Sequence, residues 1–490
     1  MTVIQFTYEQ KSSIGLQYIL ERLNPSSPYG EERVRKLRPY AREEIQFLQR
    51  DLDNLEKIRM QFGHTDMVHR MNSLKRIFMR MKDVRPALKK AGQMCLNDIE
   101  FFELKNFLIC CEQAYSIWNG FCGLTGVTGL HYEDTTEALN LLDPDLRRIP
   151  TFVLSDRYSE TLAQIRAEKR EVEKQMAAAA DQNDYEQLKQ KRHGIVLREE
   201  NEEQKIRESL TESLLPFLTQ ISHNAAVTGE IDLLFEKVSA SHWGTVVKPV
   251  IITDAPRRLT LEKAGNPWVA SFLKERGQEF TPISISLEEG AGAITGANMG
   301  GKSVALKTIT LNVMLALCGF FVYAEQAEIP VFDDVLMVSE ELQSVKQGLS
   351  SFGAEIVQMQ HVAETVEQGF CFVVLDEFAR GTNPEEGAAL VRAVIRYLNT
   401  KKVIALLVTH FDHVAEYARV HYQVAGLRDM DVEQVGHEIQ SAGREKGVAV
   451  IARHMNYGLF RVEQDLDCPK DAFRICRLLG LTQEIMDYLD

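Results

Sequence analysis

A glycine-rich octapeptide sets the strongest constraint on how this 490-residue chain folds. Residues Gly296 to Ser303 read "GANMGGKS", after the short apolar run "AGAIT" and before the helical pattern "VALKTITLNVML". A strand, a glycine loop and a helix in this order are the context of the phosphate-binding pattern G-x-x-x-x-G-K-[ST]. Glycines let backbone N–H groups wrap an anion without Cβ clashes, and the helix N-terminus adds partial positive charge. The sequence therefore predicts a nucleotide phosphate site in this loop.

Each polar position of the loop has an expected role. Gly296, Gly300 and Gly301 are expected to give the backbone its freedom around the phosphates. The Lys302 ammonium is expected to reach the β- and γ-phosphates, and the Ser303 hydroxyl to ligand Mg²⁺. ATP and Mg²⁺ are the cofactors that this pattern predicts.

The catalytic half of the site is expected at the ends of two later apolar runs. The run "CFVVL" ends in Asp376 and Glu377, and "VIALLVT" ends at His410. An acidic pair after a strand is also found in ordinary solvated turns, but downstream of a phosphate loop we favour a catalytic role. Asp376 is then expected to hold the water shell of Mg²⁺, and Glu377 to orient and deprotonate the attacking water. His410 is expected to sense the γ-phosphate and, with Glu377 and Lys302, completes the predicted catalytic set.

A fourth element, "QGLSSFGAEIVQM", contains Ser350 and Ser351 before a helical pattern that starts near Phe352. A helix N-terminus offers a second anion site, whereas an ordinary serine cap would explain the same letters. Sequence spacing leaves both interpretations open.

The hydrophobic pattern changes along the chain and predicts the fold class. We expect a mainly α-helical core with a coiled-coil arm, followed by an α/β P-loop ATPase domain with a mainly parallel sheet. In the arm, basic and acidic residues interleave in nearly equal numbers, which indicates charge pairing along two antiparallel helices. The expected divisions are a helical core at 1–156, the arm at 157–223, a helix returning to the core at 224–244, the ATPase domain at 245–430 and a C-terminal helical dimerisation segment at 431–490.

Composition limits the partners. The net charge is −14, which repels nucleic acid over the molecule as a whole. A basic segment at 57–90 could contact phosphates or could be a solvated helix face, and the solvated face is favoured because no aromatic pattern accompanies the charges. The eight cysteines are scattered. Because no secretory signal and no apolar run of about 20 residues is present, we expect a cytoplasmic protein without a membrane span.

Together these motifs resemble those of the MutS family. "ITGANMGGKS" is similar to the family's "TGPNMGGKS", with Ala297 in place of proline, and "DEFARGT" is similar to its "DE-x-x-RGT" segment. "VTHF" resembles its "ATH" switch and "LSSF" its "STF" loop. The resemblance is weak in residues 1–150 and strong from 291 to 412.

The resemblance implies a homodimer with shared ATP sites. Ser350 of one subunit would face the γ-phosphate that Lys302 of the other holds, and Asn298 would add a polar contact. The family's adenine stacks on an aromatic residue before the loop, for which Phe280 is the candidate here.

Two functions remain open. The first is a DNA-binding MutS-like ATPase that couples ATP to clamp movement without reading mismatches, because no wedge motif or connector is seen and Phe101 to Glu103 ("FFE") fall in an apolar helix. The second is a protein-remodelling ATPase that reactivates an adenosylcobalamin-dependent amino-acid aminomutase, because this chain resembles short MutS-like proteins that accompany lysine or ornithine aminomutases. The partner is therefore DNA or a protein client.

Overall fold

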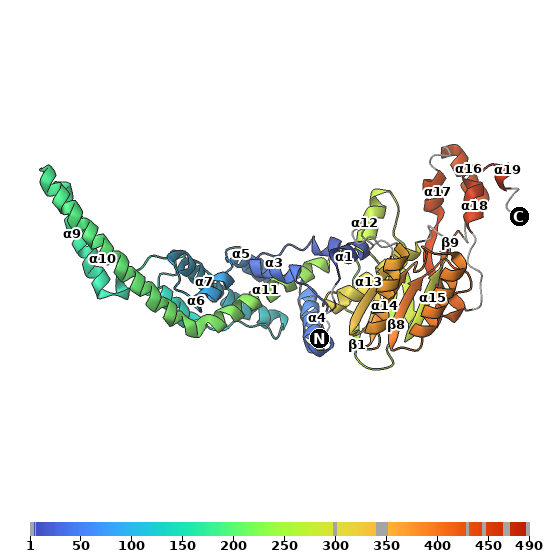
Figure 1. Ribbon diagram of the computed structural model, residues 1–490, viewed down its shortest axis with the longest axis horizontal. Coiled ribbons are helices and arrows are strands. Elements are labelled where there is room, and N and C mark those ends of the chain that lie inside the picture. The colour runs from blue at the N-terminus through green and yellow to red at the C-terminus, as the bar shows by residue number, and fades with distance from the viewer. Residues whose placement is uncertain are drawn as a thin grey trace. The chain divides into compact units, whose positions relative to one another are not determined.

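The computed structural model describes residue 4 and residues 6–296, 301–339, 351–427, 431–442, 447–463 and 471–486. Contacts between Cα atoms divide the chain into two compact units (Figure 1). The first comprises Met1–Leu23, Leu37–Glu56 and Lys237–Asp490, and the second comprises Asn24–Lys36 and Lys57–Glu236. Helices α4 (Ile45–Met60) and α11 (Leu218–Ala240) each belong partly to both units.

The second unit is helical throughout its regular structure, as the sequence predicts for the amino-terminal part. Besides its shares of α4 and α11, its α-helices are α3 (Pro28–Arg35), α5 (Thr65–Phe78), α6 (Arg85–Ala91), α7 (Asp98–Thr125), α8 (Thr136–Leu142), α9 (Glu160–Ala178) and α10 (Gln182–Leu214). The long helix α7 contributes four fully buried aromatic residues to the core of this unit: Phe101, Phe107, Trp118 and Phe121. Trp118 stacks on Phe121, and both rings contact the edge of Phe235 from α11. Phe101 of the "FFE" letters is likewise buried, as expected for a core position.

The arm consists of α9 and α10, which lie side by side and are joined by a short turn (Figure 1). Ile165, Val172 and Ile195 form a narrow apolar seam between them. Ion pairs flank this seam, such as Arg192 with Glu173 at 2.8 Å, so the interleaved charges of the sequence do pair across the two helices. Partly exposed pairs of this kind contribute little stability, about 0–1 kcal/mol each, and mainly keep the pair soluble.

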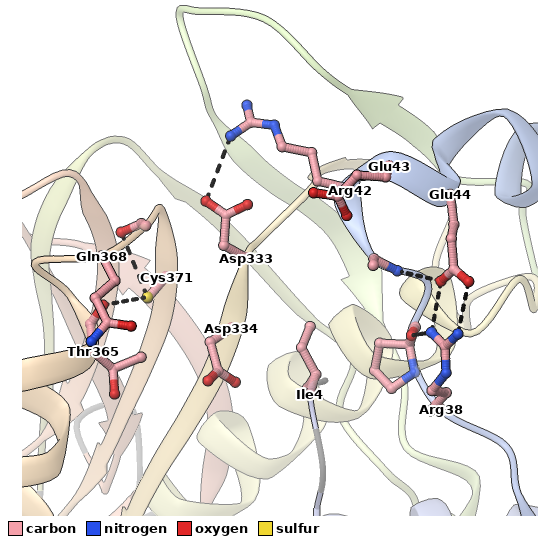
Figure 2. A pocket seen from close by; sticks show the side chains of 13 residues that line it. Ile4, Arg38, Arg42, Glu43, Glu44, Asp333, Asp334, Thr365, Gln368 and Cys371 are labelled. Carbon is pink, nitrogen blue, oxygen red and sulfur yellow. Dashed lines mark hydrogen bonds and ion pairs between the residues drawn. The ribbon is translucent and has the colours of Figure 1, made fainter. Parts of the chain in front are cut away.

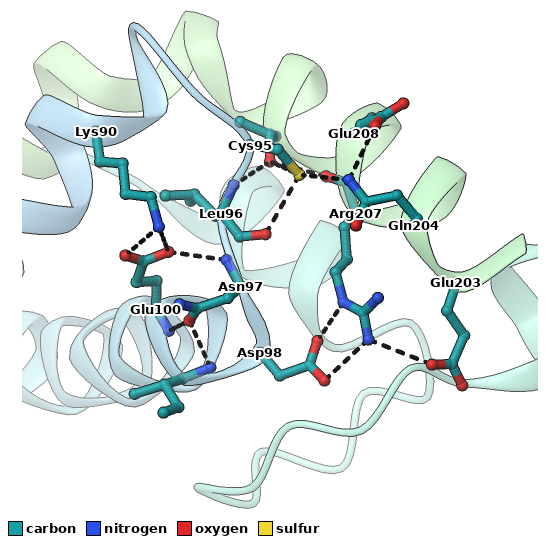
Figure 3. A network of polar contacts seen from close by, with 12 residues as sticks. Lys90, Cys95, Leu96, Asn97, Asp98, Glu100, Glu203, Gln204, Arg207 and Glu208 are labelled. Carbon is teal, nitrogen blue, oxygen red and sulfur yellow. Dashed lines mark hydrogen bonds and ion pairs between the residues drawn. The ribbon is translucent and has the colours of Figure 1, made fainter. Parts of the chain in front are cut away.

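A polar network ties the later half of α10 to the start of α7 (Figure 3). The Arg207 guanidinium donates to both carboxylate oxygens of Asp98, at 2.8 and 3.1 Å, and also to Glu203. Asn97 caps α7 in a reciprocal box with Glu100. Because planar bidentate contacts restrain orientation as well as distance, this network sets the angle between α10 and α7.

The first unit contains two β-sheets and the helices packed around them. Its strands are β1 (Val250–Ile252), β2 (Leu259–Ala264), β3 (Ile283–Leu287), β4 (Gly290–Thr295), β5 (Gln326–Pro330), β6 (Asp334–Ser339), β7 (Cys371–Asp376), β8 (Val403–Val408), β9 (Val420–Gly426) and β10 (Asn456–Arg461). Its α-helices besides its shares of α4 and α11 are α1 (Tyr8–Ile14), α2 (Leu16–Leu20), α12 (Pro267–Glu275), α13 (Lys302–Leu317), α14 (Ser351–Thr365), α15 (Pro384–Leu398), α16 (Val432–Ala442), α17 (Gly447–His454), α18 (Asp471–Leu478) and α19 (Gln483–Met486).

The larger sheet has six strands in the order β10-β9-β4-β8-β7-β6. All neighbouring pairs are parallel except β10 with β9, so the prediction of a mainly parallel sheet holds for it. Its central strands are buried along their whole length, which explains their continuous apolar sequences. Helices α14 and α15 share one apolar cluster with alternate residues of β4, β6, β7 and β8, and α13 contacts β7 and β8.

The smaller sheet was not expected. It has the order β1-β5-β2-β3, and its β2–β3 and β2–β5 pairs are antiparallel. The apolar run "VVKPVIIT" provides the short edge strand β1 of this sheet, which pairs in parallel with β5. Val250 on β1 is 56% exposed, as expected for an edge strand. The apolar sequence of this run therefore does not mean that the strand is central in a sheet.

The carboxyl-terminal part is less purely helical than expected. Strand β10 lies within 431–490 and pairs with β9, while α16 and α17 form a small apolar cluster that also takes in Leu478 of α18. Within the described part of the chain, no helix combines the length and the apolar character that crossing a membrane requires.

Candidate nucleotide-binding site

The predicted site residues follow strands whose carboxyl ends meet at one edge of the larger sheet. Asp376, the last residue of β7, is paired in register with Val408 of β8. Val408 is in turn paired with Ile294 of β4. The loop after β4, the acidic pair after β7 and the segment after β8 are therefore neighbours, because parallel strands end on the same side.

The glycine loop leaves β4 and enters α13 with backbone angles that favour glycine. Gly296 has φ +138° and Gly301 has φ +86°. Lys302, the first residue of α13, is only 4% exposed, and its ammonium group donates a hydrogen bond to the Gly296 carbonyl at 2.7 Å. The lysine side chain thus reaches back to the residue that directly follows β4.

Ser303 and Asp376 meet directly. The Ser303 hydroxyl donates a hydrogen bond to the Asp376 carboxylate at 2.9 Å, across 73 positions of sequence. A hydroxyl and a carboxylate side by side are hard oxygen ligands of the kind that Mg²⁺ prefers. These are the two residues for which the sequence predicts a metal role.

Glu377 lies in a tight turn after β7. It adopts φ +53°, which is uncommon for a residue with a side chain, and its carboxylate accepts a hydrogen bond from Arg380 at 2.7 Å. Ala379 in the same turn has φ +64°, and its amide donates to the Glu355 carboxylate of α14 at 2.9 Å. Glu355 is 1% exposed. A buried carboxylate from α14 therefore holds the turn that presents Glu377.

His410 follows β8 beside this turn. Burial lowers the pKa of His410 below its ordinary value of 6.5, while the Glu377 carboxylate opposes this and the Lys302 and Arg380 cations reinforce it. These influences show that His410 shares one electrostatic environment with the other predicted catalytic residues. Its neutral form is favoured at neutral pH.

Four predicted residues are not part of this arrangement. Asn298, Gly300 and Ser350 lie outside the described residues, so their roles stay predictions. Phe280 is half-buried in the connection between α12 and β3, and β3 belongs to the smaller sheet. Its proposed stacking on adenine also stays a prediction.

The structure adds two residues that the sequence analysis did not single out for the site. Glu355 is one of them, and a polar residue in an otherwise apolar stretch of α14 was the available signal. The other is Tyr457 of β10: a methyl group built on Gly301 would lie 2.8 Å from the Cδ1 atom of its ring. No local pattern indicates this contact, because Tyr457 and Gly301 lie far apart in the sequence and meet only in the folded sheet.

The fold and the site define an α/β protein with a glycine loop at the carboxyl edge of a mainly parallel sheet. Residues 292–473 match the family model described as MutS domain V, a range that contains the loop, the acidic pair and His410. This part of the chain is thus similar to the MutS family, in agreement with the motifs in the sequence.

Curated relatives point the same way. The chain is 33% identical over 227 residues to a protein named Endonuclease MutS2 from Carboxydothermus hydrogenoformans, covering 46% of this chain and 28% of that protein. It is 29% identical over 301 residues to the Endonuclease MutS2 of Synechocystis, covering 55% and 36%. It is 36% identical over 178 residues to that of Fusobacterium nucleatum, covering 36% and 22%. The chain thus spans at most about a third of the length of these relatives.

Proposed function

We propose that this chain binds ATP with Mg²⁺ at the edge formed by β4, β7 and β8, and hydrolyses it. The observation that carries the proposal is the hydrogen bond from Ser303 to Asp376, since it places a hydroxyl and a carboxylate at the base of a phosphate-type loop. The match to MutS domain V over the same residues supports it.

Each described residue then has a chemical task. Lys302 and the loop amides bind the β- and γ-phosphates, and Ser303 and Asp376 hold Mg²⁺ and its water shell. When bound, Mg²⁺ supplies charge neutralisation at the phosphates. Glu377 accepts the proton of the attacking water, and the Glu355 contact keeps the turn of Glu377 in position. Neutral His410 is able to receive or give a hydrogen bond near the γ-phosphate.

The proposed assembly is a homodimer with a shared site, in which Ser350 of one copy completes the site of the other. The proposed client is DNA, because the relatives reported above are named as endonucleases of the MutS2 type. The protein-remodelling hypothesis receives no comparable support, and we do not carry it further.

DNA binding by the second unit alone is expected to be weak. Three cations of the basic segment are paired with carboxylates: Arg70 with Asp66, Lys75 with Glu236 and Arg85 with Asp83. A paired cation releases fewer counterions on meeting a phosphate and contributes less to affinity.

Two substitutions test the ATPase assignment. Lys302→Ala should abolish binding of a fluorescent ATP analogue, whereas Glu377→Ala should bind it normally and release no phosphate. Lys307→Ala, a lysine further along α13, serves as the matched control and should behave as wild type. Turnover at the wild-type rate in Glu377→Ala would overturn the assignment of the general base, and unchanged nucleotide binding in Lys302→Ala would overturn the site.

A further inference from the structure

A cavity of about 450 Å³ opens at the opposite edge of the larger sheet, where β6 and β7 begin (Figure 2). It is lined by the segment between α3 and α4, by the turn between α14 and β7, and by the first residues of both strands. Its volume falls within the range of small-molecule sites, about 300–1,000 Å³. The charged residues of its lining are Arg38, Arg42, Glu43, Glu44, Asp333 and Asp334.

Asp334 differs from the other charged residues of the lining in how deeply its side chain is buried. It is only 8% exposed although it borders the cavity. One carboxylate oxygen accepts a hydrogen bond from the amide of Val335 at 2.7 Å, and the other accepts none from the described residues. Burial raises the pKa of Asp334, while the hydrogen bond from the Val335 amide and the interaction with His361 of α14 oppose this rise. Asp334 therefore borders the cavity with a carboxylate oxygen that pairs with no cation among the described residues.

The two arginines of the lining are already engaged. The Arg38 guanidinium donates two hydrogen bonds of 2.7 Å to Glu44. Arg42 lies 3.5 Å from Asp333 (Figure 2). The Asp333 carboxylate also accepts a hydrogen bond from the Phe370 amide. An anionic ligand would have to displace these contacts, whereas the unbalanced charge of the lining is negative.

We propose that this cavity binds a small organic cation, a primary ammonium with a short apolar tail, through the Asp334 carboxylate. An ammonium group donates up to three hydrogen bonds and suits one free carboxylate oxygen. Ile4, Pro39 and Cys371 provide the apolar surface for the tail.

The position of the cavity suggests that a bound ligand affects ATP turnover, an inference that rests on the proposed ATPase function. Helix α14 starts at Ser351, carries Glu355 in its first turns and ends at Thr365, which lines the cavity. An occupant at its carboxyl end therefore contacts the same helix that holds the turn of Glu377 at its other end. A bound ammonium should change the rate of ATP turnover.

Binding is measured on the full chain by ligand-observed NMR with n-butylammonium chloride, and n-butanol serves as the uncharged probe of matched size. Wild-type protein should bind n-butylammonium at least about tenfold more tightly than n-butanol, the size expected for one charge-assisted hydrogen bond. Asp334→Asn keeps the shape and the acceptor for Val335, and it should lose that preference. Glu43→Gln, which removes an exposed carboxylate of the same cavity, should keep it.

Equal binding of the two probes by wild type would overturn the proposal without reference to any variant. So would an Asp334→Asn protein that melts as wild type and still prefers the ammonium. If n-butylammonium binds as expected but no ATP is hydrolysed, the cation site stands and the proposed function fails. If the protein hydrolyses ATP but wild type and Asp334→Asn bind the two probes alike, the cation site is wrong and the proposed ATPase function stands.

Discussion

Ser303 and Asp376 are 73 positions apart in sequence, yet the hydroxyl of the first donates to the carboxylate of the second at 2.9 Å. The contact joins the first turn of α13 to the end of β7. It links the helix after the glycine loop to the acidic pair, and it allows the metal role of both residues to be tested.

Asp376→Asn should weaken Mg²⁺ binding without unfolding the protein. The amide oxygen still accepts from Ser303, but the negative charge is lost. We expect the Mg²⁺ concentration for half-maximal ATP turnover to rise at least about tenfold, which corresponds to about 1.4 kcal/mol. The matched control is Asp412→Asn, an exposed carboxylate after β8. An unchanged Mg²⁺ requirement in Asp376→Asn would remove this residue from the metal site.

Mixing two inactive variants tests whether the site is shared. Ser350→Ala should lower turnover with little loss of nucleotide affinity, and Lys302→Ala should lose nucleotide binding. A heterodimer of the two should regain about one competent site, because one of its two sites then receives both intact residues. Steady-state phosphate release at varied mixing ratios measures this. A strict monomer with full turnover contradicts the shared site.

His410 should titrate below its ordinary pKa of 6.5, because burial disfavours the charged ring. The folded pKa is then lower than the unfolded one, so the unfolded state binds more protons between the two values. The free energy of unfolding should therefore rise with pH through that window, and the contribution of His410 should be fully present above about pH 6.5. An NMR titration of the His410 ring gives the midpoint, and Glu377→Gln should lower it further, since the carboxylate raises it. A midpoint at or above 6.5 refutes this.

Glu355→Ala should lower both the free energy of unfolding and the rate of ATP turnover. It leaves the buried Ala379 amide without its acceptor, a loss of about 1–3 kcal/mol. Because the same turn carries Glu377, turnover should fall more than nucleotide affinity. Urea denaturation and ATP turnover measure the two effects, with the exposed Glu364→Ala of the same helix as control. Equal stability of the two variants would show that the Glu355 contact is not structural.

DNA with a mismatch should bind no better than perfect duplex. Mismatch reading needs a side chain inserted at a base step, at a cost of a few kcal/mol that bent-DNA contacts recover. The described residues include paired arm charges and a partly neutralised basic segment instead. Fluorescence anisotropy at about 150 mM salt, where screening is substantial, compares the two duplexes. A several-fold preference for the mismatch would contradict this expectation.

Local patterns in the sequence were sufficient to locate the glycine loop, the acidic pair, His410 and the arm. The reason is that each depends on contiguous residues: a strand–loop–helix order, an apolar run that ends in carboxylates, or a helical period with interleaved charges. The three buried strands β4, β7 and β8 could likewise be recognised, because a central parallel strand is buried on both faces and reads as a continuous apolar run.

Only the tertiary structure decided which of these segments meet. Strand register placed Asp376 beside Val408 and Ile294, and so brought Ser303 to Asp376. Strand pairing also assigned β1 to a second sheet. The packing of helices and strands brought Glu355 to the turn of Glu377 and Tyr457 to Gly301. The same packing left Asp334 buried at the opposite edge of the larger sheet. Such contacts join residues far apart in sequence, and their energy depends on burial and geometry that no single stretch of sequence specifies.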